Sequence, residues 1–317
     1  MLAASTACSS ANSGGSGDDP LAPASSGSGE PGGNGAGDGG YGRPTVLGTL
    51  QDRSVNESSG LVASRRNPGV YWTHNDSGDG PFLYCVRGRG ESCGVWSVTG
   101  AEARDWEDVA AGPGPGAGRS YLYVGDIGDN LGDQEHVTVY RAAEPEVAAG
   151  QAPPSKAAPA ATEAAEALRL TYPDGPHNAE ALLVHPQTGD LYIVTKEAEP
   201  GVYVARAPLR VGGTNALARV AVLPIGGGDS RTGVITGGDI SPDGTRVALC
   251  TYGDGYEMEA PAGQPFDAVW QQPPTRFGLG ARAVGEAIAY RLDGKALLTT
   301  SEDPLGSGTP LAQVERK

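Results

Sequence analysis

The sequence predicts an all-β fold: a single β-propeller of five blades, closed by its N-terminal strand. Three observations predict it. A pair of short apolar runs recurs five times, turn residues are abundant, and a spare strand precedes the first repeat. The 50 Gly and 25 Pro among 317 residues are too many for a helical domain.

The repeated unit is an apolar run, usually opened by an acidic residue, that leads through a polar turn into a second apolar run. The five copies open at Glu57, Glu107, Glu180, Thr236 and Glu286. Most are about 50 residues long, as expected for a four-stranded blade. The second copy is longer because it contains Ala142 to Ala167, rich in Ala, Pro and Glu. We interpret this segment as an inserted surface loop with a helical turn, outside the core. If it hides a degenerate unit, the propeller has six blades.

The last unit, from Glu286 to Lys317, is shorter than the others by about one strand. The segment Thr45 to Leu50, ahead of the first unit, reads as a spare strand. We therefore expect residues 44–50 to pair beside the strand near Leu311 to Val314 and to close the ring.

Residues 1–42 form a predicted separate region, and residues 43–317 form the propeller domain. Ser9 to Gly40 has almost nothing to bury and is predicted to be a disordered Gly/Ser-rich tether. Met1 to Ala7, followed by Cys8, is typical of the end of a bacterial lipoprotein signal, although the charged and apolar parts are missing. The alternative is a chance match. The lipoprotein interpretation predicts an extracellular protein, anchored to the cell envelope or secreted, that touches a membrane only through a lipid on Cys8.

Two further cysteines, Cys85 and Cys93, lie on predicted neighbouring strands and favour a cross-hairpin disulfide, with two free thiols as the alternative. Cys250, in the apolar strand Val247 to Cys250, is expected to be a buried free thiol. The net charge of −15 repels phosphate backbones, so we expect no nucleic-acid partner. We expect a monomer with an unknown extracellular ligand or protein partner.

The acidic residues that open the units are the candidate metal ligands. The innermost strands of a propeller line one axis, so these carboxylates should converge, and they would repel one another without a cation or protons. Oxygen ligands without a Cys or His pair suit calcium. In the alternative, each acid caps the turn into its own strand. The candidate ligands are Glu57, Glu107, Glu180, Asp239 and Glu286.

A second set of acidic residues follows the second run of several units. Its first two groups, Asp76 with Asp79 and Asp126 with Asp129, resemble calcium loops in composition, although loops between strands are often acidic without an ion. Its members are Asp76, Asp79, Asp126, Asp129, Asp254, Glu302 and Asp303. No nucleophile motif is present. If the protein is an enzyme, the catalytic candidates are Glu180 and His177, which stands three residues before Glu180.

Five motifs, over about residues 43–317, resemble secreted bacterial β-propeller lipoproteins, distantly similar to the esterase-like phytase group and the calcium-dependent propeller phytases. They are Glu57-Ser-Ser-Gly-Leu, Asp105-Trp-Glu-Asp-Val, Gly125-Asp-Ile-Gly-Asp-Asn, Asn178-Ala-Glu-Ala-Leu and Gly285-Glu-Ala-Ile. In the phytases, channel carboxylates hold calcium ions that bind phosphate and activate water. The resemblance implies that Glu57, Glu107, Glu180 and Glu286 hold such ions here. This chain departs from them in having five units instead of six blades and no Lys/Arg set placed to grip a phosphorylated ring.

The sequence is compatible with two functions. The first is a calcium-stabilised binding or scaffold protein at the cell surface. The second is a calcium-dependent hydrolase of phosphate esters or lactones, with a metal-bound water as nucleophile. Binding is favoured, because the sequence offers metal ligands without a clear general base or substrate clamp.

Overall fold

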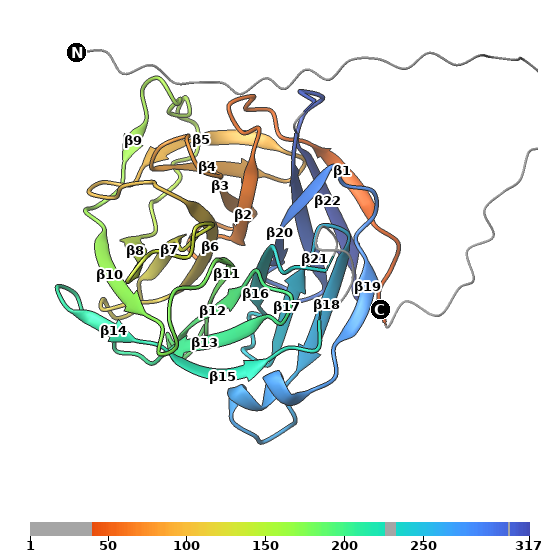
Figure 1. The fold of residues 1–317 in the computed structure, drawn as a ribbon. Coiled ribbons are helices and arrows are strands. Elements are labelled where there is room, and N and C mark those ends of the chain that lie inside the picture. Colours follow the sequence, from red (N-terminus) through yellow and green to blue (C-terminus); the bar gives the residue numbers. More distant parts are fainter. Residues whose placement is uncertain (1–39, 226–232, 304) are drawn as a thin grey trace, which may run out of the picture. The chain divides into compact units, whose positions relative to one another are not determined.

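The computed structural model describes residues 40–225, 233–303 and 305–317, and these form a five-bladed β-propeller (Figure 1). The predicted fold is confirmed. The predicted tether before Gly40, including Cys8, lies outside the described residues. Among the described residues, no helix is long and apolar enough to cross a membrane.

Five inner strands, one from each blade, surround the axis (Figure 1). Each contacts the inner strand of the next blade, and the last contacts the first. They are β2 (Ser58–Ala63), β6 (Trp106–Pro113), β11 (Ala179–Val184), β16 (Gly237–Ile240) and β20 (Val284–Tyr290).

The other strands continue outward from each inner strand, mostly as antiparallel neighbours. Blade 1 adds β3 (Val70–Asn75), β4 (Phe82–Arg87), β5 (Glu91–Ser97) and β9 (Ala160–Ala161); blade 2 adds β7 (Ser120–Asp126), β8 (Val137–Ala143), β10 (Glu166–Thr171) and β14 (Thr214–Ala216). Blade 3 adds β12 (Leu191–Thr195), β13 (Gly201–Ala205) and β15 (Ala218–Val222); blade 4 adds β17 (Arg246–Cys250), β18 (Asp254–Glu259) and β19 (Thr275–Gly278), with the 3-10 helix η1 (Phe266–Gln271) before β19.

Blade 5 contains β21 (Ala296–Glu302), β22 (Pro310–Glu315) and the N-terminal strand β1 (Thr45–Thr49). β1 pairs antiparallel with β22, with Thr45 opposite Gln313 and Thr49 opposite Pro310. The predicted closure of the ring by the N-terminal strand is confirmed.

The core consists of five apolar clusters, each between two neighbouring blades. Successive side chains on a strand point to opposite faces. Leu61 therefore packs against blade 5, whereas Val62 packs against blade 2. Both faces of β2 are buried. This is why the inner strands read as continuous apolar runs instead of alternating ones.

The segment from Ala142 to Ala167 differs from the predicted insertion. Ala142 and Ala143 belong to β8 and are buried, and Glu166 and Ala167 begin β10 in blade 2. The part between them contains no helix; it runs along the outer edge of blade 1, where β9 pairs parallel with β5. These strand ends could not be recognised in the sequence, because small Ala residues, and not large apolar ones, fill the space between the blades there. No sixth blade forms, so the five-blade prediction holds.

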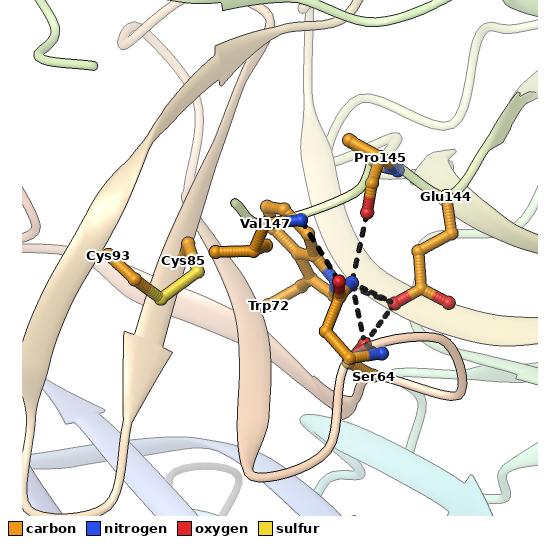
Figure 2. Close-up of a disulfide and its surroundings, with 8 residues drawn as sticks. Ser64, Trp72, Cys85, Cys93, Glu144, Pro145 and Val147 are labelled. Atoms are coloured by element: carbon orange, nitrogen blue, oxygen red, sulfur yellow. Dashed lines mark hydrogen bonds between the residues drawn. A yellow bond between two sulfur atoms is a disulfide. The ribbon is translucent and has the colours of Figure 1, made fainter. Parts of the chain in front are cut away.

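The predicted disulfide between Cys85 and Cys93 is present, and it lies beside Trp72 (Figure 2). The bond joins β4 to β5: Cys85 pairs with Gly94, Cys93 is the extra residue in the adjacent bulge, and the two Cα atoms are 4.9 Å apart. Cys250 is fully buried and free, as predicted.

Candidate metal centre

Three glutamates occupy equivalent β-bulges in the inner strands. In β6, Trp106 pairs with Asp126 and Asp108 with Gly125, so Glu107 is the extra residue. The register shifts in the same way at Glu180 of β11 and Glu286 of β20. A bulge re-aims one side chain without ending the strand. Blades 2, 3 and 5 therefore each turn one carboxylate toward the end of the propeller where the inner strands begin.

These three carboxylates are buried. Glu107, Glu180 and Glu286 are only 3%, 5% and 5% exposed. Lys196 donates a hydrogen bond to Oε1 of Glu180. Oε2 of Glu180 and Oε2 of Glu286 are buried and have no hydrogen-bond partner among the described residues. Buried carboxylate oxygens normally have partners, so these two atoms point to something additional.

Two more acids lie beside Glu107. Ligand oxygens of Asp76, Asp105 and Glu107 all lie within 4.8 Å of one another. Calcium binds oxygens at 2.3–2.6 Å, so two oxygens on one ion are at most about 5 Å apart. The three carboxylates are therefore close enough to share one calcium ion. Asp105 was not among the sequence candidates; its position two residues before Glu107 was the available signal.

Electrostatic repulsion links these residues to the other glutamates. We call the set the acidic cluster: Asp76, Asp105, Glu107, Glu180, Glu286, Glu302 and Lys196. Burial, followed by repulsion from Glu180, raises the pKa of Glu107 well above its usual value. The same two causes raise the pKa of Glu286. For Glu180, burial raises the pKa and the ammonium of Lys196 opposes it only in part. The cluster holds more negative charge than Lys196 balances.

Gly128 leaves room for this arrangement. A Cβ atom at this position would lie 2.2 Å from Oε1 of Glu107 and 2.3 Å from Oδ2 of Asp105. Such distances are far below van der Waals contact, so any other residue would push these carboxylates aside.

The remaining two predicted ligands differ from these three. Glu57 lies at the exposed border of the acidic cluster: it precedes β2, whose bulge contains Ser59 and Gly60 instead, and it forms an isolated β-bridge with Glu302. The β16–β17 ladder has no bulge, and Asp239 pairs with Ala248. The carboxylate of Asp239 accepts hydrogen bonds from the backbone N–H groups of Ile240 (2.8 Å) and Tyr290 (2.9 Å). Asp239 thus bonds backbone N–H groups, as in the alternative interpretation, but these belong to its own strand and to β20 and not to a turn.

Most acids of the second predicted set have local partners. Asp79 accepts hydrogen bonds from Lys156 and Tyr84, and Asp129 accepts them from the backbone of Asp133 and Gln134. Asp126, Asp254 and Asp303 are also bonded within their own surroundings. Asp76 and Glu302 belong to the acidic cluster, where Asp76 contributes to the raised pKa of Glu302 after burial.

The catalytic candidate His177 is engaged at both ring nitrogens. Nδ1 lies 2.7 Å from Glu197, and Nε2 lies 3.1 Å from Asp174 and 2.9 Å from the hydroxyl of Tyr203. Burial lowers the pKa of His177, but the hydrogen bonds to Glu197 and Asp174 outweigh it, and the pKa is raised. Both ring nitrogens of His177 are thus engaged by side chains of the described residues.

Comparison with known protein families and with curated proteins finds no match. Among solved structures, the chain resembles one titled "Structure of U3-55K", with 10% identity and a TM-score of 0.37. The match covers 81% of this chain and 67% of that chain. The strand order alone establishes the fold of this chain.

Proposed function

We propose that this protein is an extracellular, lipid-anchored β-propeller that acts as a calcium-stabilised binding or scaffold protein. The observation that carries the proposal is the acidic cluster. Asp76, Asp105 and Glu107 present oxygens at calcium-like separations, and buried oxygens of Glu180 and Glu286 have no hydrogen-bond partner in the part of the chain that the structure describes. Hard oxygen ligands of this kind select calcium over softer metals.

The arrangement of the cluster explains why an ion would stabilise the fold. Its carboxylates come from four of the five blades, so their repulsion opposes the packing of the inner strands. Lys196 forms an ion pair with Glu180. The negative charges of Asp76, Asp105 and Glu107 are therefore left for a second cation to balance. An ion bound there would join blade 1 to blade 2. A propeller braced in this way offers a rigid face for a ligand or protein partner.

The proposed location has support of its own. The disulfide between Cys85 and Cys93 indicates an oxidising compartment, where such bonds persist. The anchor on Cys8 remains a proposal based on the sequence before the described residues. Mass spectrometry of the protein from its native membrane would test it, since a lipid on Cys8 adds a defined mass.

Calorimetric melting with calcium and with a chelator tests the proposed function. Calcium at about a hundred times Kd should add about 2.7 kcal/mol to the free energy of unfolding and raise Tm. Glu107→Gln should remove most of the gain. Glu146→Gln should keep it, because Glu146 is an exposed acid that pairs only with Arg66 at the surface. A Tm indifferent to calcium, or an equal response in both variants, would refute the proposal.

The alternative function is a calcium-dependent hydrolase of phosphate esters or lactones. The unpartnered Oε2 of Glu180 favours it, because this carboxylate could accept a proton beside the proposed ion. A calcium-supplemented screen on a phosphate ester and a lactone would test it. Turnover that Glu180→Gln abolishes without lowering Tm would establish the enzyme, and absence of turnover would leave the binding protein.

A further inference from the structure

A pocket lined by three arginines lies at the opposite end of the propeller from the acidic cluster. Arg65 follows the end of the inner strand β2, and Arg119 follows the end of β6, whereas the cluster lies where the inner strands begin. The pocket has a volume of 550 Å³. Its lining, which we call the arginine pocket, is Arg65, Arg66, Gly118, Arg119, Ser120 and Glu163. Three arginines gathered at one pocket stand out in a chain of net charge −15, although Glu163 also lines the pocket.

Two donors in this pocket have no acceptor. Nε of Arg65 and Oγ of Ser120 are buried and make no hydrogen bond to any described residue. Arg65 also forms no ion pair in the part of the chain that the structure describes, although Asp239 and Glu144 exert a more distant attraction on it. A buried guanidinium nitrogen without an acceptor is costly. An anion in the pocket would supply the missing acceptor.

The other two arginines are available to the same anion. Arg66 pairs with Glu146, and Arg119 pairs with Glu163, and all four side chains are substantially exposed. Exposed ion pairs of this kind contribute little to stability, because water screens them. A bound anion could therefore replace these rim contacts at small cost. Arginine is suited to the task because its planar fork matches the oxygens of a phosphate, sulfate or carboxylate.

The loop that carries Arg65 and Arg66 is held rigidly. Glu144 accepts hydrogen bonds from the hydroxyl of Ser64 and from the indole of Trp72 (Figure 2). The same carboxylate accepts the backbone N–H groups of both arginines, at 3.3 and 3.2 Å. A fixed loop lowers the entropic cost of binding. Glu144 therefore holds the loop in place, and it makes no ion pair with the guanidinium of Arg65.

A larger pocket, between blades 3 and 4, differs from the arginine pocket in how its arginine is paired. It has a volume of 750 Å³ and also contains an arginine, Arg206. Arg206 is already paired with both Asp190 and Asp267. Arg65 has no such ion pair with any residue that the structure describes.

We propose that the arginine pocket binds a small molecule that carries an oxyanion, through Arg65, Arg66, Arg119 and the hydroxyl of Ser120. The volume is in the range of small-molecule sites, about 300–1,000 Å³, and leaves room for more than the anion itself. The site is separate from the acidic cluster and does not depend on the proposed calcium. Sequence reasoning missed it because Arg65 and Arg119 lie in different repeats and no motif links them.

Titration calorimetry with sodium phosphate, sulfate and acetate, at constant ionic strength in calcium-free buffer, tests the proposal. We expect saturable binding of at least one of the three. Tighter binding of phosphate and sulfate would identify a tetrahedral oxyanion, and equal binding of acetate would identify a carboxylate. Arg65→Gln should weaken the affinity at least tenfold, and Ser120→Ala about threefold to tenfold.

Two control variants make the result specific. Arg276→Gln removes one exposed arginine on β19, far from the pocket, and should change the affinity less than twofold. Glu107→Gln alters the acidic cluster and should leave anion binding intact. Failure of the calcium proposal would therefore be distinguishable from failure of the anion-binding proposal. If Arg65→Gln does not fold, Arg119→Gln and Ser120→Ala take its place. Absence of saturable binding, or equal weakening by Arg276→Gln, would overturn the proposal.

Discussion

Asp108 and Asp239 make the same pair of hydrogen bonds in blades 2 and 4. Each carboxylate accepts the N–H of the next residue, Val109 or Ile240, at 2.8 Å. Its other oxygen accepts an N–H from the inner strand of the following blade, Leu182 or Tyr290, at 2.9 Å. Burial raises the pKa of both groups, to about 6 for Asp239. These two acids join neighbouring blades through the backbone and need no ion.

Replacing Asp239 should therefore destabilise the fold without affecting calcium. Asp239→Ala leaves the N–H groups of Ile240 and Tyr290 without this acceptor, at a cost of about 1–3 kcal/mol each. We expect the free energy of unfolding in urea to fall by about 2–5 kcal/mol. Glu259→Ala, at an exposed position on β18, should change it by less than about 0.5 kcal/mol. A calcium response that disappears in Asp239→Ala would contradict this assignment.

Gly128→Ala should weaken the calcium response while the blades stay folded. The new methyl group would displace the carboxylates of Glu107 and Asp105, which are the ends of flexible side chains and can move. We expect the calcium-induced rise in Tm to shrink by at least half. The matched control is Gly253→Ala, since no atom lies within 4 Å of a Cβ there. Equal calcium responses in the two variants would show that these carboxylates bind no ion.

Lys196→Met should make the protein more dependent on calcium. The ammonium of Lys196 partly offsets the repulsion felt by Glu180 and Glu286, and its loss leaves a buried carboxylate without a counter-charge. Breaking a buried pair in this way costs about 3–5 kcal/mol. We expect a large fall in Tm in chelator and a smaller one in calcium. A loss of equal size in both conditions would mean that the ion does not relieve this repulsion.

The pKa of His177 should exceed 6.5 in the folded protein. Its neighbours are Asp174, Glu197, the hydroxyl of Tyr203 and the ring of Tyr172. A raised folded pKa means that the stabilisation is complete below the unfolded value of 6.5 and is lost as the pH rises through the folded value. NMR titration of the imidazole Cε1–H signal would measure it directly. A midpoint at or below 6.5 would show that the two carboxylates do not hold the charged ring.

The sequence predicted the blades better than it predicted the ligands. The repeat of apolar runs and the spare strand near Thr45 are visible in the chain, and they gave the blade number and the closure. The direction in which each acidic side chain points depends on whether its strand has a β-bulge at that position. The residue type alone does not predict such a bulge. Glu57 and Glu107 look alike in their motifs, yet Ser59 and Gly60 occupy the bulge of β2. Asp239 differs for the opposite reason, because β16 has no bulge.

The pairing of β1 with β22 has a consequence for the synthesis of the chain. Thr45 and Gln313 are opposite each other in one sheet, so β1 needs as its partner a strand made much later, β22. At about 5–20 residues per second, the intervening chain takes roughly 15–50 seconds to make. Blade 5 cannot form on the nascent chain during that time, and contacts of such long range fold slowly. The ring is therefore completed only once β22 has been made, and β1 has no pairing partner until then.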